Sequence, residues 1–275
     1  MVSCIKKNVR FSTEFTTSAV EGFRIIGVVF CLFLSLNAAA ANPASFEKFL
    51  TGQKAYYQGD YATAEKKFTE LASQAVDSGV LYYNLGNVFL KSQKWGEALQ
   101  YYEKAKRTFP RNRDLQKNRA VVLSHLNQES QGTFADYLLG TFYFWHAYLS
   151  REESKILFLG LSVGFWFFLS FRFGRWRRAF DSKIILCILL YAYTAFGTFL
   201  KYDAERPGAF GIVLPEEIPV RGNFLKEAEP IFTADQGTKV RILERQSLGG
   251  AEKWIKIELA AGQQGWILED AVGVI

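Results

Sequence analysis

The stretch LYYNLGNVFLKSQKWGEALQYYEKAKRTFP, residues 81–110, has the pattern of two helices joined by a short turn. Its apolar side chains recur at helical spacing and predict one buried stripe that continues from the first helix to the second: Tyr82, Leu85, Phe89, Tyr102 and Ala105. Gly86 and Ala98 are small, as expected where the helices approach closely. The turn is predicted at Gln93-Lys94-Trp95-Gly96, and Pro110 is predicted to end the second helix. One such unit cannot bury its own apolar face, so neighbouring units are expected.

This spacing resembles that of the tetratricopeptide repeat, a helix–turn–helix unit of about 34 residues. A shift of one repeat length from Gly86 and Tyr102 leads back to Gly52 and Phe68, which predicts a first repeat with its turn at Gln58-Gly59-Asp60-Tyr61. The same shift forward from Gly86 leads to Ala120, so Ala120 is expected to pack against the second repeat. The predicted boundaries are about 45–78 for the first repeat, 79–112 for the second, 113–127 for a capping helix and 42–127 for the whole domain.

Residues 1–41 have the three parts of a secretory signal peptide. Basic residues lead, an apolar core runs from Ile25 to Leu36, and the small residues Ala38 to Ala41 offer a cleavage site. The core is too short to span a bilayer comfortably, which favours a cleaved signal. An uncleaved anchor is the alternative.

Aromatic residues make up 16% of this 275-residue chain, and many of them lie in two apolar runs in its middle. This distribution predicts a membrane protein rather than one large soluble core. The expected transmembrane helices cover 151–173 and 184–202. Ser150 and Glu153 have the spacing of a capping box at the start of the first.

Basic residues surround the segment between the two apolar runs, which we expect to be a cytoplasmic loop over 174–183. They are Arg172, Arg175, Arg177, Arg178 and Lys183. Such a loop would also attract anionic lipid. The two spans would then form a hairpin in a bacterial inner membrane, with the N-terminal and C-terminal domains both outside the cytoplasm.

Residues 128–150 are a linker that leads into a segment rich in aromatic residues. A helix at the membrane interface, where Trp and Tyr concentrate, is one interpretation. A helix that packs on the repeats is the other.

The last part of the chain, residues 207–275, contains short β-type runs separated by polar and glycine-containing turns. It resembles the bacterial SH3 family, which implies a small all-β barrel. The matching residues are Val220-Arg221, Gly237-Thr238-Lys239-Val240, Trp254-Ile255-Lys256-Ile257 and Gly265-Trp266-Ile267. Trp254 and Trp266 lie in strand patterns, so we expect them in the core.

The chain contains no recognisable catalytic motif or set of metal ligands, so no cofactor and no enzymatic activity are predicted. The net charge of the chain is +6, but its basic residues are scattered, which argues against a nucleic-acid partner. The tetratricopeptide resemblance implies a protein-binding groove on the first helices of the repeats. Its candidate residues are Gln53, Tyr57, Tyr83, Asn84, Asn87, Lys91 and Lys117. An ordinary solvated helix surface is the alternative.

The fold class predicted is therefore a multidomain membrane protein with all-α tetratricopeptide hairpins, a two-helix transmembrane hairpin and a small all-β SH3-like barrel. This order of parts resembles the BatE-type proteins of the Bacteroides aerotolerance operons. The segment Phe142-Tyr143-Phe144-Trp145-His146 adds to the likeness. The resemblance implies a scaffold in an envelope complex, with Bat membrane proteins that carry von Willebrand A-like domains and a MoxR-type ATPase as partners. A tether that binds peptidoglycan through the barrel is the other function considered.

Overall fold

The computed structural model describes residues 43–74, 78–127, 141, 148–175, 182–204, 206, 208–225, 228–248 and 252–275. The predictions of a signal peptide over 1–41 and of an interfacial helix within 128–150 fall largely outside these residues. So do Arg177 and Arg178, and the side chains of Arg172, Arg175 and Lys183. These predictions therefore stay predictions.

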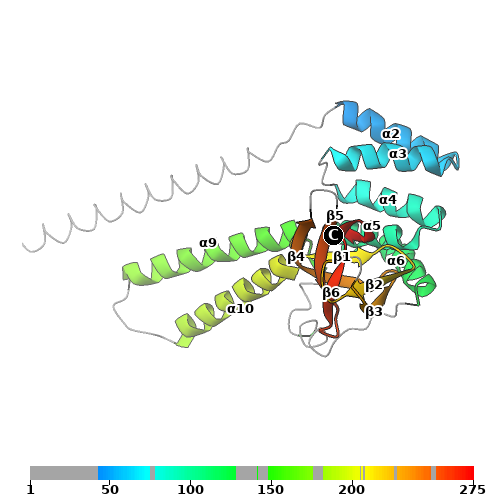
Figure 1. Cartoon of the computed structure of the whole chain (residues 1–275). Helices are drawn as coiled ribbons and strands as arrows, with labels where there is room; N and C mark the ends of the chain where they lie inside the picture. The colour runs from blue at the N-terminus through cyan, green and yellow to red at the C-terminus, as the bar shows by residue number, and fades with distance from the viewer. Residues whose placement is uncertain are drawn as a thin grey trace, which may run out of the picture. The chain divides into compact units, whose positions relative to one another are not determined.

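Helices form the first part of the described chain and are arranged as successive hairpins (Figure 1). They are α2 (Pro43–Tyr57), α3 (Tyr61–Ser73), α4 (Gly79–Lys91), α5 (Trp95–Thr108) and α6 (Arg113–His125). Side chains cap several of them: the Asp60 carboxylate accepts a hydrogen bond from the Thr63 amide at 3.0 Å, and Asn112 accepts one from the Leu115 amide at 2.9 Å. The turns are shorter than predicted, because Tyr61 begins α3 and Trp95 begins α5.

In each of the two hairpins, a glycine of the first helix packs against an aromatic ring of the second helix, and the two contacts lie one repeat length apart. A Cβ atom added to Gly52 would lie 2.8 Å from the Phe68 ring, and one added to Gly86 would lie 2.5 Å from the Tyr102 ring. Phe68 and Tyr102 are fully buried. The helical repeat predicted from the sequence is therefore present in the structure.

The expected contact of Ala120 with the second repeat is wrong. Ala120 is exposed, whereas Leu115 and Val122 of the same helix are buried. Gly52 and Gly86 each pack on the second helix of their own repeat. Within the described residues, α6 has no such second helix after it, so its equivalent position faces solvent.

The apolar runs form α9 (Arg151–Arg175) and α10 (Ser182–Ala204), which lie alongside each other (Figure 1). The capping box at the start of α9 is confirmed: the Glu153 amide donates to the Ser150 hydroxyl at 3.2 Å, and the Ser150 amide donates to the Glu153 carboxylate at 2.8 Å. Between the helices, Phe165 stacks on Tyr191 with ring centroids 4.6 Å apart. Within the described residues, one helical segment is long and apolar enough to cross a membrane, Ile185–Asp203, with a mean hydropathy of 1.5.

The C-terminal part is an antiparallel sheet, whose described strands follow the order β3-β2-β6-β5-β4-β1-β7. The strands are β1 (Phe210–Val213), β2 (Glu217–Arg221), β3 (Pro230–Asp235), β4 (Lys239–Leu248), β5 (Glu252–Glu258), β6 (Gln264–Leu268) and β7 (Val272–Val274). Trp254 and Trp266 are buried, as expected.

The sheet packs on α5 through strands β1 and β7. The Gln100 side-chain amide donates to the Val274 carbonyl at 3.0 Å. Two glycines allow this approach, because a Cβ atom on Gly273 would lie 2.4 Å from Gln100, and one on Gly96 would lie 2.9 Å from the Leu214 carbonyl oxygen. Ile212 of the sheet joins the same buried apolar cluster as the repeat helices. The repeat helices and the sheet therefore share an interface.

An ion pair of Glu103 and Arg119 joins α5 to α6 beside this interface. Burial alone would raise the pKa of Glu103, but Arg119, together with Lys106 and Lys239, holds that pKa below its usual value. Lys239 belongs to β4. The positive charge of Lys239 on the sheet thus helps to lower the pKa of Glu103 on the repeat helix α5.

Candidate protein-binding surface of the repeat helices

The predicted groove residues occupy equivalent positions on the first helices of the units, α2, α4 and α6. Gln53 is equivalent to Asn87, Tyr57 to Lys91, and Tyr83 to Lys117, each one repeat length apart. Tyr57, Lys91 and Lys117 are exposed, whereas Gln53, Tyr83, Asn84 and Asn87 are partly buried.

Tyrosine rings gather on this surface between α2 and α4. Tyr57 is 78% exposed, and its ring contacts that of Tyr56 with centroids 5.7 Å apart. Burial, followed by the nearby hydroxyls of Tyr61, Tyr83 and Tyr57, raises the pKa of Tyr56. Tyr56 of α2 therefore lies near enough to Tyr83 of α4 for their hydroxyl groups to interact. We call these tyrosines of α2 and α4 the tyrosine surface: Tyr56, Tyr57 and Tyr83.

Asn87 is the centre of a polar network rather than a free contact for a ligand. Its side-chain oxygen accepts hydrogen bonds from the Tyr102 hydroxyl at 2.8 Å and from the Asn118 amide at 2.9 Å. Burial raises the pKa of Tyr102 well above its ordinary value, so its hydroxyl stays protonated and donates. Asn87 therefore helps to hold α4, α5 and α6 together, and its predicted contact with a partner stays a prediction.

The remaining predicted residues are placed differently from one another. The Asn84 amide donates to the Val80 carbonyl of its own helix at 2.8 Å, which fixes its orientation. Lys91 ends α4, and Lys117 lies on α6. The arrangement offers flat aromatic area from the tyrosine surface, an amide group from Asn84 and exposed positive charge from the two lysines. These groups suit a polypeptide with apolar and acidic side chains.

Sequence reasoning missed Tyr56 and Asn118. Asn118 could have been found, because it lies one repeat length after Asn84. Tyr56 gave no such signal, since its equivalent one repeat later is Leu90, an ordinary apolar residue.

Within the described parts of the chain, no group of three or more His, Cys, Asp or Glu side chains is arranged to hold a metal ion. His125 stacks on Trp95 with ring centroids 4.1 Å apart. That contact places the histidine at the junction of α5 and α6.

Comparison with known proteins identifies one repeat. No curated protein matches the chain. A family model described as the tetratricopeptide repeat matches residues 80–112, which contain α4 without its first residue, all of α5 and the closing contact of Gly86 with Tyr102.

Proposed function

We propose that this protein is a membrane-anchored adaptor that binds a protein partner through the tyrosine surface, outside the cytoplasm. The observation that carries the proposal is the contrast between two faces of the repeat helices. The sheet covers the outer face of α5 at Gln100, whereas the tyrosine surface remains accessible with Tyr57 78% exposed. The match to the tetratricopeptide repeat supports a role in protein–protein interaction.

The interface between α5 and the sheet also supports the proposed membrane hairpin. The repeat helices precede α9, and the sheet follows α10, yet they are in contact through Gln100 and Val274. Two parts in contact must lie on the same side of a membrane. The number of crossings between them is then even, which fits α9 and α10 as two spans. The basic loop of residues 174–183 would face the cytoplasm.

In this proposal the sheet is a bacterial SH3-like domain, and the protein is a BatE-type scaffold of an envelope complex. Its partners would be Bat membrane proteins with von Willebrand A-like domains. A binding activity needs no cofactor and no catalytic residue, so the protein would not be an enzyme.

The alternative function, a peptidoglycan tether, would use the sheet. One observation favours it: Ile231 on strand β3 is 61% exposed. An exposed apolar side chain on a strand could contact a ligand.

Site-specific photo-crosslinking in the full-length protein tests the proposal. A photoreactive phenylalanine in place of Tyr83 should form discrete protein adducts in intact cells, and the same group in place of the exposed Lys66 on α3 should not. Adducts that are identical at both positions would contradict the proposal. The tether would be favoured by two results together. No adducts would form, and the full chain would sediment with isolated peptidoglycan unless it carries Ile231→Asp.

A further inference from the structure

The tyrosine surface carries several hydrogen-bond donors that are not used within the described residues. There, the hydroxyl groups of Tyr56, Tyr57 and Tyr83 form no hydrogen bond, and neither does the side-chain amide of Gln53. Gln53 lies four positions before Tyr57 on α2, so the two side chains share one face of the helix. Burial raises the pKa of Tyr56, so this hydroxyl keeps its proton to donate. The surface therefore suits a molecule that brings acceptors.

Two rings of this surface meet at a steep angle. Tyr57 is 78% exposed, and its ring plane is inclined by 75° to that of Tyr56, with centroids 5.7 Å apart. Such a pair presents the face of one ring beside the edge of the other, so a compact, rigid side chain can contact both. Leu50, two turns before Tyr57 on the same face of α2, is 46% exposed and adds apolar area.

The neighbouring positions on α4 do not suit an amphipathic helix as the partner. A helix bound in a groove buries its apolar face and satisfies its own backbone groups. On α4 the surface continues with Asn84 and Asn87, whose amide side chains are polar and partly buried. An extended chain differs from a helix because its backbone carbonyls still need donors. The donors of the tyrosine surface therefore favour an extended partner.

A segment in the polyproline II conformation matches these donors. Its backbone carbonyls make no hydrogen bonds within the segment, and proline has no N–H group, so the segment offers acceptors only. Its rings pack on exposed aromatic side chains. The conformation is largely fixed before binding, so little free energy is lost in ordering it. That economy matters on a surface formed by only two repeats.

The charges around the surface favour acidic residues beside the prolines. Lys91 ends α4 at the position equivalent to Tyr57, and Lys54 lies one turn before Tyr57. Both lysines are exposed, and neither forms an ion pair within the described parts of the chain. Helix α4 contains no acidic residue, and the carboxylate of Asp60, which follows α2, accepts a hydrogen bond from the Thr63 amide at 3.0 Å.

We infer that the tyrosine surface binds a proline-rich segment of the partner protein in the polyproline II conformation, with acidic residues beside the prolines. The inference rests on the proposed function, because it names the class of partner for the same surface. Tyr56 and Tyr57 contact the proline rings, Gln53 and the tyrosine hydroxyls donate to the backbone carbonyls, and Lys91 binds an acidic side chain.

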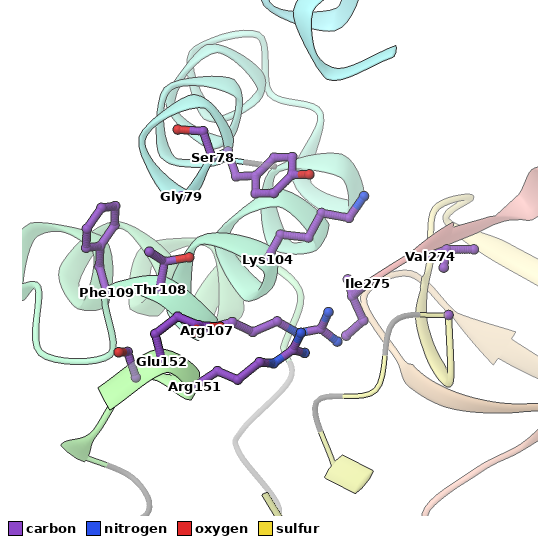
Figure 2. Close-up of a pocket in the computed structure, with 13 residues that line it drawn as sticks. Ser78, Gly79, Lys104, Arg107, Thr108, Phe109, Arg151, Glu152, Val274 and Ile275 are labelled. Carbon is purple, nitrogen blue, oxygen red and sulfur yellow. The ribbon is translucent and has the colours of Figure 1, made fainter. Parts of the chain in front are cut away.

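A cavity of about 630 Å³ at the ends of α4 and α5 is a different place (Figure 2). Its walls also include the first turn of α9 and the segment around Val274 and Ile275, and no residue of the tyrosine surface lines it. Glu152 in its wall is 71% exposed. Glu152→Gln should therefore leave the affinity for a proline-rich peptide unchanged.

The test uses the full chain in detergent micelles and three fluorescent peptides of equal length, with binding followed by fluorescence polarisation. The first peptide repeats the unit proline, proline, glutamate. The second has alanine in place of every proline, and the third has lysine in place of every glutamate. We expect the first peptide to bind on the order of tenfold more tightly than either of the others.

Substitutions locate the binding site. Tyr57→Ala should lower the affinity for the first peptide roughly tenfold, and Tyr57→Phe should lower it less because the ring remains. Tyr57 is largely exposed, so neither variant should change the melting temperature. The matched control is Tyr202→Ala, which removes a tyrosine that is 57% exposed at the end of α10. Lys91→Gln should weaken binding about threefold at low salt, and Lys66→Gln on α3 should not.

Three results would overturn the inference. The proline and alanine peptides could bind equally, or neither could bind. The preference for proline could remain unchanged in Tyr57→Ala. Binding could be lost in Ile231→Asp but not in Tyr57→Ala, which would place the proline site on the sheet. Crosslinks at Tyr83 separate these failures from failure of the proposed function: adducts in cells without a preference for proline contradict the class of partner alone, whereas absence of both contradicts the adaptor as well.

Discussion

The second repeat has two faces whose surroundings differ. On α5, small residues and a glutamine let the sheet approach closely, with Gly96 against the Leu214 backbone and Gln100 bonded to Val274. On α4, Tyr83 belongs to the tyrosine surface, in which Tyr57 of α2 is 78% exposed. Small side chains therefore mark the face that the sheet occupies, and large aromatic ones mark the face that we propose for a protein partner. The substitutions below test that difference.

The largest effect is expected for Gly86→Leu, which fills the contact that closes the second repeat. Even a Cβ atom at this position would lie 2.5 Å from the Tyr102 ring, so the helices must separate. We expect a loss of about 3 kcal/mol or more of unfolding free energy, at the upper end for overpacked cores. The matched control is Ala120→Leu, at the equivalent but exposed position of α6. Thermal melts of the full chain in detergent that fall equally for the two variants would contradict the packing role.

Gly96→Val should separate α5 from the sheet. Its Cβ atom would meet the Leu214 carbonyl oxygen at 2.9 Å, and backbone atoms cannot move as a flexible side chain can. The expected cost is about 2 kcal/mol. A carbodiimide crosslink between Glu103 and Lys239 should weaken at the same time, and it should persist in the control Lys66→Val on α3. An unchanged crosslink would show that the interface does not depend on the small residue.

Asn87→Ala tests whether this groove position is structural. It leaves the buried Tyr102 hydroxyl and the Asn118 amide without their shared acceptor, so stability should fall by about 1–2 kcal/mol. The comparison is Asn84→Ala, which removes only a bond within one helix and should cost less than about 0.5 kcal/mol. Equal melting temperatures for the two variants would show that the hydrogen bonds of Asn87 do not stabilise the helices.

The smallest effect is expected on the loss of folding stability at acidic pH. The pKa of Glu103 is lowered in the folded protein from a reference value of 4.5, so its ion pair stabilises the fold above that pH and is lost as the pH falls through the lower folded value. Glu103→Gln should remove roughly 1 kcal/mol of this pH-dependent stability. Glu70→Gln breaks an exposed pair with Lys48 at 3.9 Å and should leave the acid dependence intact. Denaturant melts at pH 5 and pH 3 would reveal the difference, and parallel losses in all three proteins would contradict it.

The sequence predicted contacts that depend on local periodicity. The step from Gly86 to Gly52 identified the two glycines at which the helices approach closely, and the spacing of Ser150 and Glu153 identified a capping box that forms as expected. These features involve residues on one helix or in one repeat. Their spacing reflects the helix itself, so a single sequence displays it.

The sequence did not predict contacts between distant segments. Gln100 and Val274 are separated by 174 positions, and no periodicity connects them. For the same reason Gly96 was assigned to a turn, although its small size serves the approach of the sheet to α5. Asn87 was assigned to the groove because its position on the helix fits either role. Only the partners Tyr102 and Asn118 decide between them.

The proposed topology places the repeat helices and the sheet together outside the cytoplasm, on a hairpin of α9 and α10. Alkaline phosphatase, which is active only after export, tests it directly when it is fused to the chain after Arg178 or after Ile275. We expect the phosphatase to be inactive after Arg178 and active after Ile275. Activity after Arg178 together with inactivity after Ile275 would contradict it.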